Sequence, residues 1–407
     1  MKIRILFLVL PSVLLVVCPY LTIGATLDDI KNLEAQLFAN YSTVPRPIYN
    51  QSETINVGLE VFLMSLIQLD AVLGSIDISI GATIKWTDLR LTWDPSSYGG
   101  LSTMTVDPST IWTPGVFILS TADELDTITD SKFHAYISSD GNVTWTVGKL
   151  VLSSCEVDMA KFPVDTQICT IELMPWGYSA QEVSFYALSS TINLAYSNPN
   201  GEWDIDSTSV AALDTYQPHN AAMAVQLTLS RKSTYFIMSL ILPMNILGFL
   251  TPFVFLLPIS AGRISYALTM FLSLAVYMTI ISDDVPPVSE PMAGITYYTF
   301  IAMICSSAAV LLTIVTLRSE AKEDLNDFPK LLVRVVKWLA TRFNRKGRGA
   351  QIEDGSEGSK SKKPDKNETD LKITRDTVLK YTDIFLFIFS LFIFFLVNII
   401  FIAVYFN

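Results

Sequence analysis

Apolar and polar residues alternate along several segments in the first half of the chain. In residues 76–86 the even-numbered positions, ending with Trp86, carry Ile, Ala or Trp, while the odd-numbered positions are polar or glycine. A period of two predicts a β-strand with one buried and one solvated face. Similar alternation in residues 59–69, 142–152 and 223–229 predicts further strands. We therefore expect a β-sandwich over this half of the chain.

The second half contains four apolar runs without any charged residue, at 234–257, 264–282, 291–317 and 384–406. Each run is near or above the ~20 residues that an α-helix needs to cross the hydrocarbon core of a bilayer. No run of this length occurs in residues 26–232. The predicted fold class is a β-sandwich extracellular domain followed by an all-α four-helix transmembrane domain.

Charge predicts how the chain crosses the membrane. Residues 318–380 carry 16 of the 28 Lys and Arg residues, and the positive-inside rule places this segment in the cytoplasm. Residues 26–232 hold 24 acidic against 9 basic residues, a net charge of −15, and lie outside. With three helices in 233–317 and the fourth in 381–407, both termini are extracellular. We expect a multi-pass protein of the plasma membrane.

The N-terminus has the pattern of a secretory leader. Two basic residues precede an apolar run that ends near Pro19, and the small residues Gly24 and Ala25 follow. This pattern predicts a cleaved signal peptide over residues 1–25, with a first membrane anchor as the alternative.

Four Asn-x-Ser/Thr sites occur along the chain. Those at Asn40, Asn50 and Asn142 fall in the extracellular part, so we expect glycosylation there. The fourth, at Asn367, falls in the cytoplasmic segment and should carry no glycan.

The chain has four cysteines. Cys18 lies in the leader and Cys305 in the third apolar run, which leaves Cys155 and Cys169 as the pair for an oxidising compartment. A bridge between them would close a loop of about fifteen residues and contribute roughly 3 kcal/mol to stability.

The cytoplasmic segment has two parts. Residues 328–346 place apolar side chains on one helical face and basic side chains toward the other. This predicts an amphipathic helix on the inner leaflet, with membrane lipid as its partner. Residues 350–370 have the composition of a disordered linker.

Several motifs, taken together, resemble the Cys-loop family of pentameric ligand-gated ion channels. Cys155 and Cys169 are separated by thirteen residues that include Phe-Pro-Val-Asp, WTDLRLTWDP begins at Trp86, GEWD ends at Asp204, and Arg231 precedes the apolar runs. The resemblance runs from about residue 50 to the C-terminus. It implies a nicotinic-acetylcholine-receptor-like subunit of a divergent invertebrate type, assembled as a homopentamer or with related subunits.

The resemblance implies that the disulfide loop rests on the membrane domain. There it would meet the connection between the second and third spans, residues 283–294, whose three prolines restrict the backbone. Arg231 would pair with Asp165 or Asp70. The alternative is that the bridge only stabilises the sandwich. The candidate coupling residues are Phe162, Pro163, Asp165, Arg231, Asp70 and Pro287.

The second apolar run carries a stripe of residues suited to a pore. Its members recur at steps of four and three and so share one helical face. Five copies around an axis would form hydroxyl rings, an apolar constriction that closes by dewetting, and an acidic mouth. The alternative is a buried helix whose polar residues face neighbouring spans. The candidate pore-lining residues are Ser265, Thr269, Leu272, Val276, Thr279 and Asp283.

The start of this helix matches neither the cation nor the anion channels of the family. Cation channels usually carry Glu before the basic residue and anion channels Pro-Ala, whereas this chain has Ala261-Gly262-Arg263. Asp283 and Asp284 at the mouth and the acidic extracellular domain favour inorganic cations. An anion channel is the alternative.

The family's ligand site is an aromatic box between neighbouring subunits, because a ring face attracts an ammonium ion. Trp176 matches the central Trp, and Trp86 matches the aromatic residue of the opposing subunit. Leu119 stands where the family offers Tyr, so part of the box is missing. We expect a small-molecule ligand, with a cationic amine as one candidate. The candidate ligand-binding residues are Trp176, Tyr178, Trp86, Tyr216, Leu119, Thr144 and Thr146.

Two functional interpretations follow. One is a subunit of a pentameric channel that a small extracellular ligand opens. The other is a binding or assembly subunit that is silent alone or needs a partner subunit. The sequence contains no metal-ligand spacing, nucleophile elbow or phosphate loop. We therefore expect no enzymatic activity, no cofactor, no metal site and no nucleic-acid partner.

Overall fold

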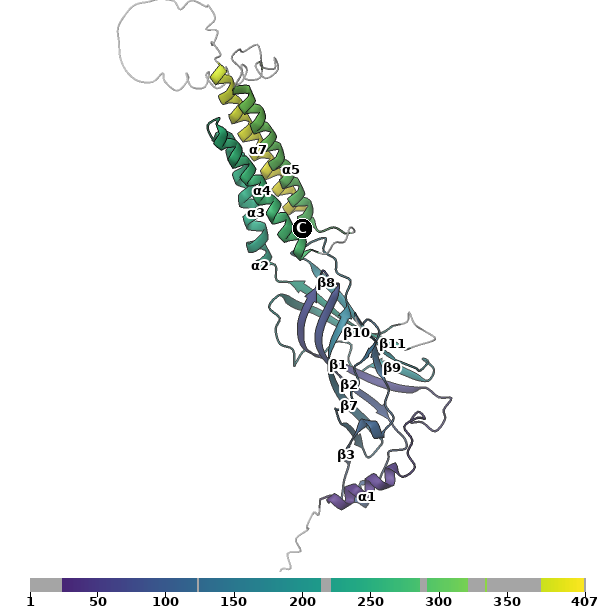
Figure 1. The fold of residues 1–407 in the computed structure, drawn as a ribbon. Coiled ribbons are helices and arrows are strands. Elements are labelled where there is room, and N and C mark those ends of the chain that lie inside the picture. The colour runs from purple at the N-terminus through teal and green to yellow at the C-terminus, as the bar shows by residue number, and fades with distance from the viewer. Residues whose placement is uncertain are drawn as a thin grey trace, which may run out of the picture.

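The computed structural model describes residues 24–122, 124–213, 221–285, 291–320, 334 and 375–405. Figure 1 shows an elongated molecule with the strands in one part and the long helices in the other, and with α1 (Leu27–Phe38) at the far end of the strand part. The predicted fold class is confirmed, because two sheets precede four helices that are long and apolar enough to cross a membrane. Almost all of the predicted signal peptide, amphipathic helix and linker lies outside the described residues.

Two sheets form the extracellular sandwich in the described part of the chain. The six-stranded sheet has the order β3-β6-β7-β2-β1-β9, and the five-stranded sheet has the order β10-β11-β8-β4-β5. The strands of the first are β1 (Ile55–Asp70), β2 (Ser75–Thr87), β3 (Thr103–Val106), β6 (Ala135–Ser138), β7 (Asn142–Ser154) and β9 (Val183–Ala187). Those of the second are β4 (Val116–Ile118), β5 (Asp126–Thr127), β8 (Thr166–Pro175), β10 (Trp203–Leu213) and β11 (Ala222–Arg231).

The alternation of side chains along the strands decides which residues fill the space between the sheets. The even-numbered residues Ile76, Ile80 and Ile84 of β2 are at most 1% exposed, and the odd-numbered residues lie on the other face of the strand. Leu227 and Leu229 of β11 belong to the same core cluster. The period-two pattern therefore places the core correctly.

The polar residues after Trp86 form a buried network. Asp88 is fully buried and accepts hydrogen bonds from Tyr41 Oη at 2.7 Å and from Arg90 Nε at 2.9 Å. The Arg90 guanidinium lies 4.2 Å from the centroid of the Tyr41 ring. Burial and the bond to Asp88 raise the pKa of Tyr41, so its hydroxyl stays protonated and donates. This network attaches the segment that follows α1 to the sandwich.

Two prolines interrupt the first span. It runs through α2 (Thr234–Phe236), a π-helical segment Ile237–Ile241, α3 (Leu242–Leu250) and a 3₁₀ segment Thr251–Leu256. Pro243 and Pro252 stand at the starts of the last two segments, because proline lacks the N–H that would continue the preceding hydrogen-bond ladder. The continuous helices are α4 (Ala261–Asp284), α5 (Gly294–Glu320) and α7 (Arg375–Tyr405).

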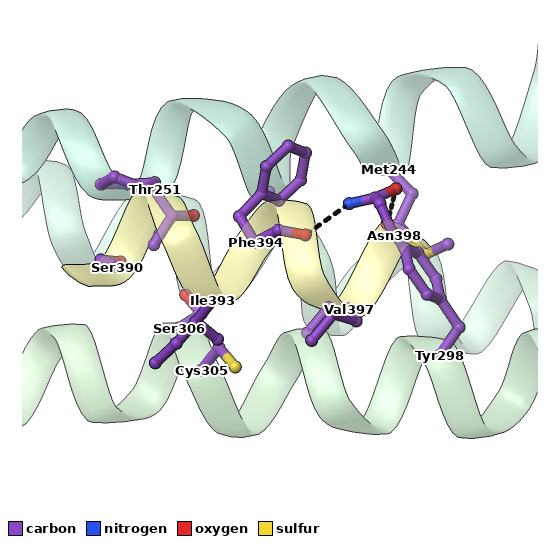
Figure 2. Close-up of a pocket in the computed structure, with 13 residues that line it drawn as sticks. Met244, Thr251, Tyr298, Cys305, Ser306, Ser390, Ile393, Phe394, Val397 and Asn398 are labelled. Carbon is purple, nitrogen blue, oxygen red and sulfur yellow. Dashed lines mark hydrogen bonds between the residues drawn. The ribbon is translucent and has the colours of Figure 1, made fainter. Parts of the chain in front are cut away.

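A small cavity of about 40 Å³ lies between the first span, α5 and α7, as Figure 2 shows. Beside it, Tyr298 Oη lies 2.9 Å from Asn245 Oδ1 and 3.0 Å from Asn398 Oδ1, so polar side chains of three spans meet inside the bundle. Ser306 Oγ lines the cavity and has no hydrogen-bond partner among the described residues. The cavity has room for a water molecule that would satisfy this hydroxyl.

A disulfide joins the two sheets. Cys155 directly follows β7, Cys169 lies in β8, and their sulfur atoms are bonded. Both residues are buried, at 3% and 0% exposure. The pairing expected from the sequence is confirmed, and the bridge holds both ends of the loop between the two strands.

Replacing Cys155 by Ser should prevent assembly at the cell surface. The substitution removes roughly 3 kcal/mol of loop-entropy stabilisation and leaves a hydroxyl and a thiol buried between the sheets. Surface biotinylation followed by sizing of the oligomer measures this effect. Cys305→Ser is the matched control, because Cys305 is a free cysteine in α5. Normal surface oligomers of Cys155→Ser would rule out a folding role for the bridge.

Candidate functional site

Arg231, the last residue of β11, forms a buried ion pair with Asp165 of the disulfide loop. Arg231 Nε lies 2.8 Å from Asp165 Oδ1, and Nη2 lies 3.1 Å from Oδ2. Arg231 Nη1 lies 2.8 Å from Glu202 Oε1. The Arg231 and Asp165 side chains are 4% and 1% exposed. Of the two acids expected to pair with Arg231, the structure places Asp165 there, whereas Asp70 accepts hydrogen bonds from two backbone N–H groups of the turn that follows it.

The tip of the disulfide loop packs into the helical part. Phe162 is 2% exposed, and its ring meets that of Phe236 in the first span edge to face at 5.1 Å. The Ala160 carbonyl accepts a hydrogen bond of 3.2 Å from the N–H of Gly294, where α5 begins. Phe162 also shares an apolar cluster with Ile281 of α4. The loop therefore reaches three of the four spans.

Of three further residues expected at the functional sites, only one lies within the described residues. Pro163 follows Phe162 through a cis peptide bond at the loop tip. Pro287, expected in the connection between the second and third spans, and Tyr216, expected in the ligand site, lie outside the described residues.

Trp176 is presented at the end of β8 in the five-stranded sheet. Gly177 adopts a φ of 86° directly after it, a conformation that suits glycine and turns the chain. The Trp176 side chain is 49% exposed, and its ring lies 6.1 Å from that of Phe117 in β4. Leu119 follows β4 in the same sheet and is half-buried. The ends of β8 and β4 therefore present Trp176 and Leu119 as candidate ligand-binding residues.

The structure corrects the ligand role expected for Trp86. Trp86 is 3% exposed and meets Trp112 edge to face at 6.0 Å inside the core. Strand parity is the reason, since Trp86 occupies the same face of β2 as its buried isoleucines. Tyr178 is half-buried and also packs on Trp112, and its hydroxyl accepts a 3.1 Å hydrogen bond from Trp112 Nε1. Trp86 and Tyr178 therefore belong to the fold of one chain.

Thr144 and Thr146 lie on the outward face of the six-stranded sheet. Thr146 is exposed and Thr144 half-buried, on the same side of β7. Thr146 Oγ1 lies 3.2 Å from Thr83 Oγ1 of β2. In one chain these threonines and Trp176 belong to different sheets. A ligand that contacts both surfaces would therefore lie between two copies of the chain.

The same outward face carries an aromatic side chain that the sequence analysis missed. Phe62 of β1 lies over Gly81 of β2, so close that a Cβ at position 81 would stand 2.1 Å from its ring. Tyr196 packs edge to face on Phe62 at 5.6 Å. Phe62 occupies a position of β1 where the alternation predicts a polar, outward-facing residue, and it pairs with Gly81. An apolar residue at an outward position beside a glycine is the signal that could have identified it.

The candidate pore stripe points away from the helices of its own chain. Leu272 and Val276 are 64% and 52% exposed, whereas Leu274 between them is 1% exposed. The hydroxyls of Thr269 and Thr279 donate to carbonyls of α4 itself. The other stripe positions, Ser265, Thr269, Thr279 and Asp283, are exposed as well. One chain alone therefore leaves this face of α4 uncovered.

Comparison with known proteins identifies the family. The family model of the neurotransmitter-gated ion-channel ligand binding domain matches residues 30–233. The chain belongs to this family. It is 29% identical to the Homo sapiens neuronal acetylcholine receptor subunit alpha-10 over 324 residues, which cover 78% of this chain and 72% of that relative.

Two further relatives carry similar names. The Bos taurus neuronal acetylcholine receptor subunit alpha-3 is 28% identical over 304 residues, or 73% of this chain and 61% of the relative. The Caenorhabditis elegans acetylcholine receptor subunit beta-type acr-2 is 28% identical over 293 residues, or 71% of this chain and 50% of the relative. The chain is thus a Cys-loop, nicotinic-like receptor subunit and not an enzyme, as the sequence predicts.

In this receptor subunit, Asp165→Asn should reduce agonist-evoked current far more than surface expression. Asn keeps the size of Asp165 but removes its charge, so Arg231 keeps only Glu202 as an acidic partner and the disulfide loop is held less firmly to β11. Dividing the current by the amount of surface protein separates coupling from folding. The charge exchange Asp165→Arg with Arg231→Asp should recover part of the current. Asp70→Asn is the control, because Asp70 caps its own turn. Unchanged current per surface receptor in Asp165→Asn would contradict a coupling role.

Proposed function

We propose that five copies of this chain form a plasma-membrane ion channel that a small extracellular ligand opens. The exposed stripe of α4 carries this proposal, since hydroxyl groups in line with the carboxylate of Asp283 on one uncovered helical face suit a surface that meets water. A ring of five α4 helices around a central axis covers the stripe with copies of itself. Related subunits, instead of identical ones, would form the same ring.

Leu272 and Val276 are the proposed gate. Between the hydroxyl of Thr269 and that of Thr279 the stripe offers only these two apolar side chains, both more than half exposed. Leucines that face one another across a narrow pore expel water, and a dry constriction blocks ions. Widening or wetting this ring opens the pore.

Inorganic cations are the proposed permeant ions. Asp283 is exposed at the end of α4 that lies toward the sandwich, where five copies would form an acidic ring. The extracellular segment 26–232 carries 24 acidic and 9 basic residues, so its field also concentrates cations near this mouth.

The proposed ligand site lies between the Trp176 edge of one subunit and the Thr144, Thr146 and Phe62 face of the next. A half-exposed indole face attracts a cationic amine, and the threonine hydroxyls supply hydrogen bonds. The relatives are named acetylcholine receptor subunits, which agrees with an ammonium ligand. Leu119 makes the box less aromatic, so a subunit that needs a partner chain for full affinity is the second candidate.

Exposure supports glycosylation of the sandwich, which the proposed topology places outside the cell together with both termini. The three candidate glycosylation sites of the extracellular part, Asn40, Asn50 and Asn142, are all exposed. Asn142 is the first residue of β7, and its side-chain amide donates a hydrogen bond to Asp140 Oδ2 at 2.7 Å.

Replacing Leu272 by Ser should raise spontaneous current and lower the agonist concentration needed for half-maximal response. The hydroxyl wets the constriction and thereby stabilises the open state without touching the ligand site. Val276→Ser should act in the same direction more weakly. Leu274→Ser is the matched control, because Leu274 is 1% exposed on the opposite face. Opening by Leu274→Ser with no effect of Leu272→Ser would mean that the pore face is wrongly assigned.

Replacing Trp176 by Ala should weaken agonist potency by about tenfold or more, because a desolvated cation–π contact contributes ~2 kcal/mol. Concentration–response curves with a panel of amines on expressed receptors measure this. The agonist potency of Trp176→Phe, which keeps an aromatic ring, should lie between that of the unsubstituted receptor and that of Trp176→Ala. Equal potency in all three would place the ligand elsewhere.

A further inference from the structure

A buried ion pair connects the pore helix to the last span at the end of the bundle away from the sandwich. Arg263 Nη2 lies 2.7 Å from Asp383 Oδ1, and Nη1 lies 3.1 Å from Oδ2, so the two groups meet in a bidentate contact. The Arg263 side chain is 0% exposed and that of Asp383 14% exposed. The guanidinium carbon also lies 5.5 Å from the centroid of the Phe255 ring.

Arg263 belongs to the face of α4 that is opposite to the candidate pore stripe. Ala267, Leu274 and Ile281 follow it at steps of four and seven and are 3%, 1% and 2% exposed. Ser265, the first stripe residue, is two positions further along the chain, which is about 200° around a helix. The positive charge is therefore directed at α7 and away from the pore axis.

The position of this charge matters because it stands at the start of α4, beside the first polar ring of the proposed pore. A guanidinium is always charged, and a buried one needs a paired anion. Asp383 supplies that anion, while Arg263 Nε has no hydrogen-bond partner among the described residues. Without the carboxylate, Arg263 needs another polar environment, and we expect its long side chain to extend to the water beside Ser265 at the proposed pore entrance, two residues along the helix.

We propose that Asp383 is a positioning residue for ion selectivity, which acts by holding Arg263 out of the conduction path. With the pair intact, this entrance presents the hydroxyl of Ser265 to passing ions. With the pair broken, copies of Arg263 add a ring of positive charge that repels cations and attracts anions. A helix that faces lipid in the bundle thereby controls the charge of the pore. The inference rests on the proposed pore face of α4.

Asp383 also borders a groove lined by other charged residues. Glu320, Asp376 and Lys380 line this groove together with Asp383. Asp376 is exposed in the first turn of α7. Asp376→Asn therefore removes one negative charge from the same helix without touching the contact with Arg263, and it serves as the matched control for a general effect of surface charge.

Reversal potentials in sodium chloride gradients test the inference. Asp383→Asn should lower the ratio of cation to anion permeability by about tenfold, whereas Asp376→Asn should leave it unchanged. Asp383→Glu should keep it close to the wild-type ratio. Adding Arg263→Gln to Asp383→Asn should restore cation preference, since no charge is then left to enter the pore.

Co-expression of Asp383→Asn with the unsubstituted chain at rising ratios covers the case in which the variant alone fails to assemble. A graded shift of the reversal potential supports the inference, and a constant reversal potential at falling current overturns it. The unsubstituted channel and Leu272→Ser provide the reference. If neither channel conducts, or if Leu272→Ser has no effect, the result contradicts the proposed pore face of α4. A role of Asp383 in ion selectivity is contradicted only by the constant reversal potential.

Discussion

The contact between Arg231 and Asp165 is the constraint on which the connection of the two parts depends. Arg231 is the last residue of β11, and the first span begins at Thr234. Because both charges are buried, neither can leave the other without a large cost in free energy. The disulfide loop therefore stays attached to the last strand, and Phe162 at its tip stays among the spans. In the proposed channel, a movement of the sandwich would reach the helices through these packed groups.

Helix α4, the proposed pore helix, has two faces that meet different environments. Its buried stripe, from Arg263 to Ile281, packs against the other spans, and its opposite stripe is exposed in the single chain. The two stripes are set by the helical period alone. Their contents differ in kind, with hydroxyls, two apolar residues and a carboxylate on one side and an ion pair followed by apolar residues on the other. The orientation of α4 about its own axis that leaves Leu272 exposed therefore also buries the charge of Arg263.

The candidate ligand surface shows a similar division within β2. Its even-numbered residues fill the core, which explains why Trp86 packs on Trp112. Its odd-numbered residues face outward, and the missing side chain of Gly81 makes room for Phe62 of the neighbouring strand. An aromatic ring thus reaches the outward surface from β1, whereas the sequence led us to expect Trp86 of β2 there.

The sandwich, the four spans and the stripe of α4 can be predicted from the sequence because they follow from local periods and from charge. The disulfide pair can be predicted because Cys18 and Cys305 lie in apolar runs. The alternation that predicted β2 also contained the evidence against Trp86 as a ligand residue, since it placed Trp86 on the buried face. Three contacts become visible only in the folded chain: Asp165 and not Asp70 pairs with Arg231, Phe62 covers Gly81, and Asp383 meets Arg263. These contacts join residues 66, 19 and 120 positions apart, and no local period carries information about which distant side chain fills a given space or neutralises a given charge.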